Sequence, residues 1–274
     1  MTLFSPWPYN HWILHAYTSA RKNGNVNLII SAPHGGNIVP SDIPDRTAGC
    51  FNSTNNVCIW KHNCGDSDSK QCATTTVRDV MSDDFAKNVA KQLKTKYGLS
   101  PYMVIGQWNR KKVDFNREQN EGTMNNLEGI HGHQSYHSFI LRAIAKIKGQ
   151  FGRGLLIDVH GHAAGNYSMI GYLLTGDDLN ADQLVKQTSI EELIHASCSK
   201  NRNECIRGDK SFGFLLEANN LGIAYPSSNH PKPGDKKFFS GGYITRQYIS
   251  DMNAIQTELP NYMRTGPERN DFAS

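Results

Sequence analysis

The sequence predicts an α/β fold in which helices cover both faces of a largely parallel or mixed β-sheet. Short apolar runs alternate with helix-like segments from one end of the chain to the other. Helices between buried strands require crossover connections, which produce parallel strand pairs. No internal repeat or long linker divides the 274 residues, and 38% of them are hydrophobic. We therefore expect one domain, residues 1–274, with an ordinary globular core.

Six short runs have the apolar, branched composition of buried strands. The first of them, VNLIISA, ends directly before proline, histidine and two glycines. The expected strands are residues 26–32, 102–107, 154–160, 169–174, 223–227 and 254–259. In open α/β sheets, ligands bind at the carboxyl ends of such strands. Polar side chains at these ends are therefore candidates for function.

Four segments have the composition of helices, and the clearest is residues 83–98, with Ser82 as N-cap and Gly98 as the stop. The other expected helices are residues 134–150, 190–197 and 211–220. Residues 226–243 form a long loop rich in proline, glycine and lysine. Loops of this length in a compact domain are usually functional lids or disordered tips.

The charge distribution excludes two classes of partner. The net charge of +4 comes from 29 basic and 25 acidic residues spread along the chain, so we expect neither a nucleic-acid interface nor a polybasic membrane anchor. No apolar run approaches the roughly 20 residues that span a bilayer. The N-terminal stretch is too interrupted by proline and polar residues to be a signal peptide.

The cysteines indicate an oxidising compartment. Four of the six, Cys50, Cys58, Cys64 and Cys72, lie in a polar segment that could hardly bury a core of its own. We expect these four to pair among themselves in an insertion at about residues 45–75, and Cys198 to pair with Cys205. The alternative, a structural zinc site, lacks CxxC pairs. Sequons at Asn52 and Asn166 also fit a secreted, extracellular glycoprotein.

Two strand ends carry histidines. His34 follows the first strand in the run IISAPHGG, and Asp158, His160 and His162 end the strand of GLLIDVHGHA. Asp158 and His160 are two residues apart, so on a strand they share a face, where the carboxylate can orient the imidazole or bind the same ion. The alternative is that these histidines are hydrogen-bonded or solvated structural residues. Two such strand ends favour a shared metal site.

Two further segments contain candidate catalytic or binding residues. Asn116 and Arg117, in VDFNRE after the basic run Arg110 to Lys112, offer an amide and a guanidinium that suit an oxyanion or a carboxylate. Glu258 lies inside the apolar strand AIQTEL. A carboxylate there is costly unless it is paired, metal-bound or catalytic, and burial would raise its pKa towards the range of a general base.

The order of these motifs resembles zinc carboxypeptidases and, more closely, the N-formylglutamate amidohydrolases. The phrases SAPHGG, SDDFAKNVA, VDFNRE, GLLIDVHGHA, FSGGYITRQY and AIQTELP look like that family's motifs in the same order, over most of residues 28–260. The resemblance leaves out the cysteine-rich insertion, the N-terminal arm and the tail. It implies a three-layer α/β sandwich with a central mixed, mostly parallel sheet, the carboxypeptidase-like, phosphorylase/hydrolase-like fold.

The resemblance also implies a zinc (Zn²⁺) hydrolase that cleaves an amide bond in a small N-acylated amino acid or peptide. His34 and His160 match the two histidine ligands. The carboxypeptidase pattern has a glutamate three residues after the first histidine, where this chain has Asn37, so the third ligand stays open. Asp83 matches an acidic residue of the amidohydrolase motif and is preferred to Asp84 or Asp158.

The remaining roles follow from the same resemblance. Glu258 matches the general base, which would take a proton from a zinc-activated water and return it to the leaving amine. Asn116 and Arg117 match the polarising and carboxylate-binding pair, and Arg246 is a second candidate for binding a substrate carboxylate. A small molecule or peptide with a free carboxylate is thus the expected partner.

Two alternatives stay open. The chain could be a secreted binding protein on a hydrolase scaffold, because Asn37 interrupts the carboxypeptidase pattern and the insertion offers a surface for interaction. It could also be a zinc peptidase that acts on larger peptides or polymers, which differs only in the width of the cleft.

Overall fold

The computed structural model describes residues 25–64, 71–267 and 272–273, and the N-terminal stretch considered above lies outside them. The fold is α/β, with a central sheet of six strands in the order β5-β1-β6-β9-β7-β8. Strands β5, β1, β6 and β9 are parallel, β7 is antiparallel to β9, and β8 is parallel to β7. The strands are β1 (Leu28–Ala32), β5 (Tyr102–Ile105), β6 (Leu155–His162), β7 (Tyr167–Gly171), β8 (Ile223–Tyr225) and β9 (Asn253–Pro260). All six expected strands are confirmed, and the sheet is mixed but mostly parallel.

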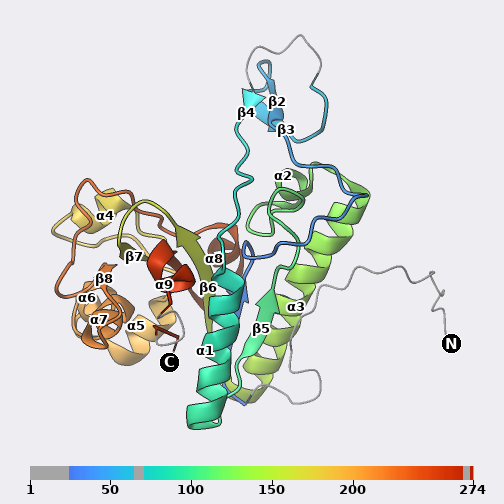
Figure 1. The fold of residues 1–274 in the computed structure, drawn as a ribbon. Helices are drawn as coiled ribbons and strands as arrows, with labels where there is room; N and C mark the ends of the chain where they lie inside the picture. The colour runs from blue at the N-terminus through green and yellow to red at the C-terminus, as the bar shows by residue number, and fades with distance from the viewer. Residues whose placement is uncertain (1–24, 65–70, 268–271, 274) are drawn as a thin grey trace.

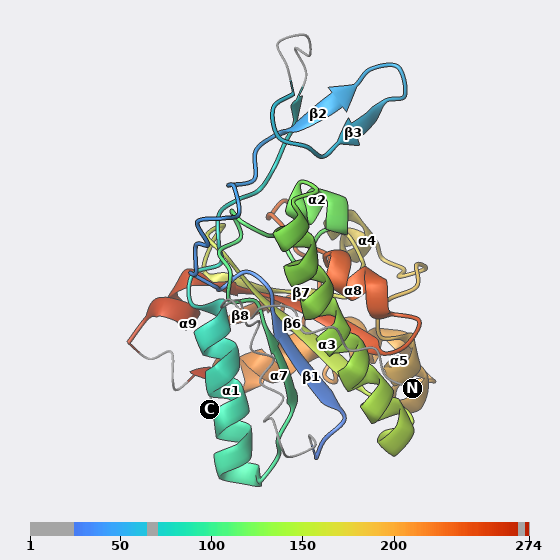
Figure 2. The ribbon, with the colours of Figure 1, turned by 90° about the vertical axis from the view of Figure 1, so that its right-hand side faces the viewer.

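Helices cover both faces of this sheet. Helices α1 (Ser82–Tyr97) and α9 (Asn261–Thr265) pack on one face, and α3 (Leu127–Phe151) and α8 (Tyr243–Tyr248) on the other. Figure 2 shows α1 and α3 on opposite sides of β1. Successive strand residues point to opposite faces, so Ile29 packs under α3 and Ile30 packs under α1. The expected three layers are therefore present.

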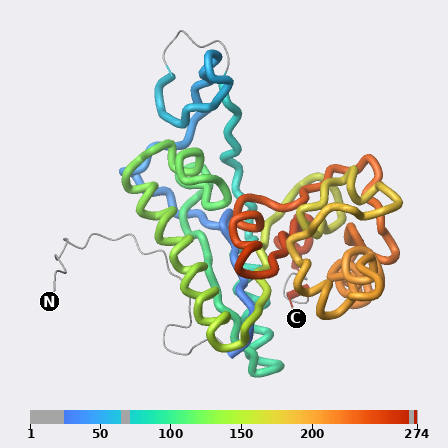
Figure 3. Tube along the Cα trace, turned by 180° about the vertical axis from the view of Figure 1, so that it is seen from behind, coloured from blue at the N-terminus to red at the C-terminus, as the bar shows by residue number. Residues whose placement is uncertain are grey.

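The β7–β8 end of the sheet carries a group of short helices: α4 (Gly176–Asn180), α5 (Glu191–Ser197), α6 (Arg202–Arg207) and α7 (Phe212–Ala218). They form the yellow and orange lobe of Figure 3. The expected disulfide between Cys198 and Cys205 joins the end of α5 to α6. The long loop of residues 226–243 follows β8 and leads into α8, as expected.

Helix starts differ from the sequence prediction. Helix α1 ends at Gly98, in the left-handed conformation, as expected, but Ser82 is its first residue and the cap position is Met81. Helix α3 begins at Leu127 rather than at 134, because the Asn126 side chain accepts a hydrogen bond from Gly129 N and caps the helix there. The five-residue helix α2 (Gln119–Thr123) precedes it. None of the helices in the described part of the chain combines the length and the apolar character that a membrane crossing needs.

The cysteine-rich insertion forms a small sheet of its own, with β2 (Gly49–Asn52) between β3 (Val57–Ile59) and β4 (Gln71–Cys72). Its disulfides join Cys50 to Cys64 and Cys58 to Cys72, so the expected local pairing is confirmed. Figure 1 shows the insertion standing above α2, outside the layered body. At its base, Arg46 Nη1 donates to Thr75 O (3.0 Å) and to Arg110 O (3.1 Å).

Candidate metal centre

Three neighbouring strands bring polar side chains to one end of the sheet. His34 lies just beyond β1, His160 lies near the end of β6, and Glu258 lies on β9 directly opposite His160 in the strand register. All three are buried, with exposed fractions of 1%, 2% and 7%. The expectation that the two histidines meet across strand ends is confirmed, since their Nδ1 atoms are 3.1 Å apart.

Asp79 completes this cluster. It lies in the loop between the insertion and α1, and its Oδ2 is 3.0 Å from His160 Nδ1 and 3.4 Å from His34 Nδ1. Asp79 N donates to His34 O (3.0 Å), and Gly161 N donates to Asp79 Oδ2 (3.2 Å). Within the described ranges, His34, Asp79 and His160 form a group that could hold a metal ion, with ligand atoms within 4.8 Å of one another.

The outer nitrogen of each imidazole faces a second carboxylate. His34 Nε2 is 2.7 Å from Asp114 Oδ1, and His160 Nε2 is 2.8 Å from Asp158 Oδ2. Both carboxylates are fully buried. A carboxylate holds a proton on the nitrogen that it contacts, so the other nitrogen of a neutral imidazole is left to bind a metal ion. Burial opposes a charge on His160, but Asp158 outweighs it and raises the pKa of that imidazole well above its ordinary value. The two Nδ1 atoms and the Asp79 oxygen therefore converge where a cation could take the place of a proton.

The two carboxylates that contact the outer nitrogens, Asp114 and Asp158, have hydrogen-bond partners of their own. Arg110 Nε donates to Asp114 Oδ2 (2.8 Å), Arg46 Nη1 lies 3.6 Å from the same oxygen, and Ser31 Oγ donates to Asp158 Oδ1 (2.6 Å). Burial opposes the charge of Asp114, but the charges of His34 and Arg110 outweigh it and hold the pKa of that carboxyl well below its ordinary value. Asp114 is therefore fixed in position and ionised, and Asp158 is fixed by the hydroxyl group of Ser31.

The two acidic groups of the cluster differ in their ionisation. Burial opposes the charge of Asp79, yet its hydrogen bonds with His160 and His34 hold its pKa below the ordinary value. Burial raises the pKa of Glu258 to about 7, against the lowering effect of His160. Gln256 Nε2 donates to Glu258 Oε1 (2.8 Å) and orients the carboxyl group. One group is thus suited to bind a cation and the other to exchange a proton.

The cluster is largely shielded from solvent. Asp79 and Glu258 have exposed fractions of 9% and 7%, whereas those of the two histidines are 2% or less. All four side chains thus belong to the buried part of the molecule.

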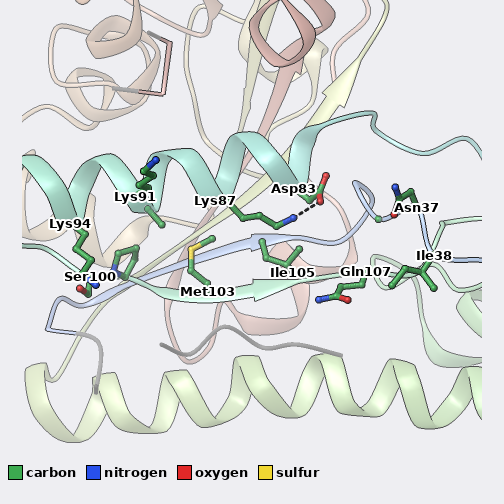
Figure 4. A pocket seen from close by; sticks show the side chains of 13 residues that line it. Asn37, Ile38, Asp83, Lys87, Lys91, Lys94, Ser100, Met103, Ile105 and Gln107 are labelled. Carbon is green, nitrogen blue, oxygen red and sulfur yellow. Dashed lines mark hydrogen bonds and ion pairs between the residues drawn. The ribbon is translucent and has the colours of Figure 1, made fainter. Parts of the chain in front are cut away.

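The structure does not bring Asp83, the third ligand expected from the sequence, to the histidines. Asp83 lies one turn further along the chain, at the start of α1, and its Oδ2 accepts a hydrogen bond from Lys87 Nζ (2.7 Å). Figure 4 shows this pair in a groove of about 590 Å³ between α1 and β5, which Asn37 also lines. The loop before α1 places Asp79 at the cluster instead, and Asp84 Oδ1 also contacts Lys87 Nζ (3.3 Å).

The other expected site residues surround the cluster at different distances. Asn116 Nδ2 is 3.2 Å from His160 Nε2, while its Oδ1 accepts a hydrogen bond from Ile244 N (2.7 Å). Arg117 Nε donates to Glu121 Oε1 (2.9 Å), and Arg246, exposed on α8, donates to Gly241 O (3.0 Å). Among the residues that the structure describes, neither guanidinium contacts the cluster.

His162 does not join the cluster either. Its Nε2 is 2.7 Å from Tyr167 O, and its Nδ1 accepts a hydrogen bond from Ala164 N (3.0 Å). Both ring nitrogens therefore serve to hold the turn between β6 and β7. The structural alternative considered for the histidines thus describes His162.

The sequence did not reveal one residue of the cluster, Asp79, or two residues that support it, Asp114 and Arg110. Asp79 lies in TTTVRDVM, a stretch with no periodic pattern, so nothing local distinguished it. Asp114 lies inside the motif VDFNRE, where a carboxylate between two apolar residues was a usable signal. Arg110 belongs to a basic run that resembles a solvated surface, yet its side chain is buried against Asp114.

The chain matches no protein-family model and no curated protein sequence. Among solved structures, it is similar to an N-formylglutamate amidohydrolase from Ralstonia eutropha JMP134, with 12% sequence identity, a TM-score of 0.47 and 90% of each chain covered. It is also similar to a gene product of Agrobacterium tumefaciens, with 10% identity, a TM-score of 0.45, and 91% of this chain and 86% of that chain covered. The first of these belongs to the family that the sequence motifs resemble. At these identities the likeness concerns the fold and says nothing about a substrate.

Proposed function

We propose that this chain is a metal-dependent hydrolase that binds one zinc ion through His34, Asp79 and His160. The proposal is carried by the convergence of two Nδ1 atoms and a carboxylate oxygen within 4.8 Å. Because Asp114 and Asp158 hold the outer nitrogens, each imidazole can release the proton of its inner nitrogen and offer that lone pair to a bound cation beside the carboxylate oxygen of Asp79. Two imidazoles and a carboxylate are a usual ligand set of catalytic zinc.

The reaction that fits this arrangement is hydrolysis by an activated water. A zinc ion in such a site lowers the pKa of a coordinated water to about 7 and polarises a substrate carbonyl. Glu258 is the proposed general base, because its carboxyl group is opposite His160 in the register and is held by Gln256. Glu258 would accept the proton of the attacking water and return it to the leaving amine.

The proposed substrate is an amide of a small N-acylated amino acid or peptide with a free carboxylate. The low exposure of the cluster supports a small substrate over a polymer. Arg117 and Arg246 remain the proposed carboxylate-binding residues. Arg117 is the better placed of the two, because it follows Asn116, whose amide contacts His160. The three disulfides support an extracellular site of action, and glycosylation at Asn52 and Asn166 belongs to the same proposal.

One observation favours a different function, a secreted binding protein on a hydrolase scaffold. The insertion stands outside the body, and its strand β3 exposes Val57 and Ile59 by 48% and 41%. Exposed apolar residues of this kind are typical of interaction surfaces when they form a patch. This alternative predicts that the chain neither needs nor binds a metal ion.

Metal content and hydrolysis together decide between these functions. Chelator-free protein is expected to contain one zinc ion per chain and to hydrolyse members of a panel of N-acylated amino acids and peptides. A chelator should stop hydrolysis, and added zinc should restore it. Protein that neither contains nor binds zinc would support the binding-protein alternative. Hydrolysis confined to long peptides would instead indicate a peptidase.

A further inference from the structure

We propose that Arg264 is a positioning residue that holds Asp79 in place as the third metal ligand. This inference rests on the proposed metal site. The two histidines follow from the strands that carry them, but Asp79 lies on a loop. The position of Asp79 therefore depends on contacts that the loop makes with the rest of the molecule.

One guanidinium group joins this loop to two strand ends. Arg264 lies in α9 with an exposed fraction of 3%. Its Nε donates to Leu259 O (3.2 Å) on β9, and its Nη2 donates to His162 O (3.3 Å) at the end of β6. Its Nη1 donates to Val80 O, the carbonyl of the residue that follows Asp79. The side chain thus fixes the Asp79 loop to the strands that carry His160 and Glu258.

Gly161 makes this arrangement possible. A Cβ atom added there would lie 2.2 Å from Arg264 Cζ, so the guanidinium occupies the space that any other residue would need. The N–H of the same glycine donates to Asp79 Oδ2. Arg264 and Gly161 therefore act on Asp79 from both ends, one through the backbone of the loop and one through the carboxylate.

The loop itself needs such support. Met81, two residues after Asp79, has a φ of 63°, a left-handed conformation that is unfavourable for a non-glycine residue. Conformations of this kind persist only where the surroundings hold them. A lysine at position 264 would keep the charge, but its single ammonium cannot reproduce a planar fork that donates to three carbonyls.

The first experiment measures zinc affinity by competition with a chromophoric chelator, using the full chain. Arg264→Lys and Gly161→Ala should each weaken zinc binding about 10- to 100-fold, as the loss of support around a ligand typically does. The matched control is Arg207→Lys. Arg207 donates to the carbonyls of Leu179, Ala181 and Asp182 in the helical lobe and has no contact with the cluster. The Arg207→Lys variant should lower the Tm of the zinc-free protein without changing zinc affinity.

A double-mutant cycle separates positioning from general stabilisation. If Arg264 acts through the Asp79 carboxylate, then Arg264→Lys should not weaken zinc binding further in an Asp79→Asn background, which keeps a neutral oxygen ligand and therefore a weaker but measurable affinity. Unchanged affinity in Arg264→Lys and Gly161→Ala, or additive losses in the cycle, would overturn the role of Arg264. Failure of the wild-type chain to bind zinc would instead overturn the proposed function. Gly161→Ala keeps the test decisive should Arg264→Lys fail to fold.

Discussion

The cluster of His34, Asp79, His160 and Glu258 and the cysteine-rich insertion are stabilised in contrasting ways. The cluster lies at the ends of strands that are covered on both faces, and its carboxylates are fully or largely buried among fixed hydrogen-bond partners. The insertion stands outside these layers, its strand β3 is exposed along its length, and two disulfides cross-link it. Where the chain buries apolar area, packing can hold charged groups in place. Where it buries little apolar area, disulfide bonds stabilise the structure instead.

The contrast predicts that single substitutions in the cluster have the largest effects. His34→Ala and His160→Ala should abolish zinc binding, because each removes one of three ligands. Each also leaves a fully buried carboxylate, Asp114 or Asp158, without its imidazole, which should cost about 3–5 kcal/mol of unfolding free energy. Elemental analysis and thermal unfolding, with and without a chelator, measure both effects. Normal zinc content in both variants would disprove the proposed site.

Glu258→Gln should have the next largest effect, and it should change turnover but not metal binding. An amide keeps the shape of the side chain but cannot accept a proton, so kcat should fall by about 10²- to 10⁴-fold while zinc content stays at one ion per chain. Steady-state kinetics and metal analysis of the same preparation check this. Unchanged turnover would place the general base elsewhere.

The insertion should respond in a more limited way. Replacing Cys58 and Cys72 by serine opens a link between residues 14 positions apart, which should destabilise the insertion by about 3 kcal/mol. Limited proteolysis should then cut within residues 47–74, while zinc content is unchanged because no ligand lies there. Loss of zinc in this variant would show that the insertion and the cluster are not independent.

The smallest effect is expected at the candidate carboxylate-binding residues. Arg117→Lys or Arg246→Lys keeps the charge but loses the bidentate geometry, so the true contact should show a drop of about tenfold in kcat/KM. The measurement compares an N-acyl amino acid with its C-terminal amide in the wild type and in both variants. Equal kcat/KM for acid and amide in the wild type would show that no free carboxylate is recognised.

The sequence predicted the parts of this site that depend on local pattern. The strand-like runs before His34 and around His160 and Glu258 showed both the sheet and the edge where these side chains meet, because strand ends carry local signals. The Cys198–Cys205 pair and the local pairing of the other four cysteines followed from spacing in the same way, whereas the partners within those four did not. None of this required knowledge of distant contacts.

The third ligand could not be predicted in this way. Asp83 was preferred because it lies in a motif before a helix, and Asp79 is one turn earlier in a stretch without periodicity. Asp79 reaches the cluster only because His34 O and Gly161 N bind it and because Arg264 holds the next residue. His34 and Gly161 lie 45 and 82 positions from Asp79, and Arg264 lies 184 positions from Val80. A local pattern in the sequence cannot reveal partners at these separations.

The contact between Arg46 and Thr75 at the base of the insertion has a consequence for the history of the chain. Arg46 donates to Thr75 O, so the segment of residues 47–74 leaves and rejoins the body at nearly the same place. A segment anchored in this way costs the body little loop-closure entropy and can be gained, lost or exchanged as a module. The body could therefore acquire a new surface at this point without rebuilding the strands on which the proposed metal site depends.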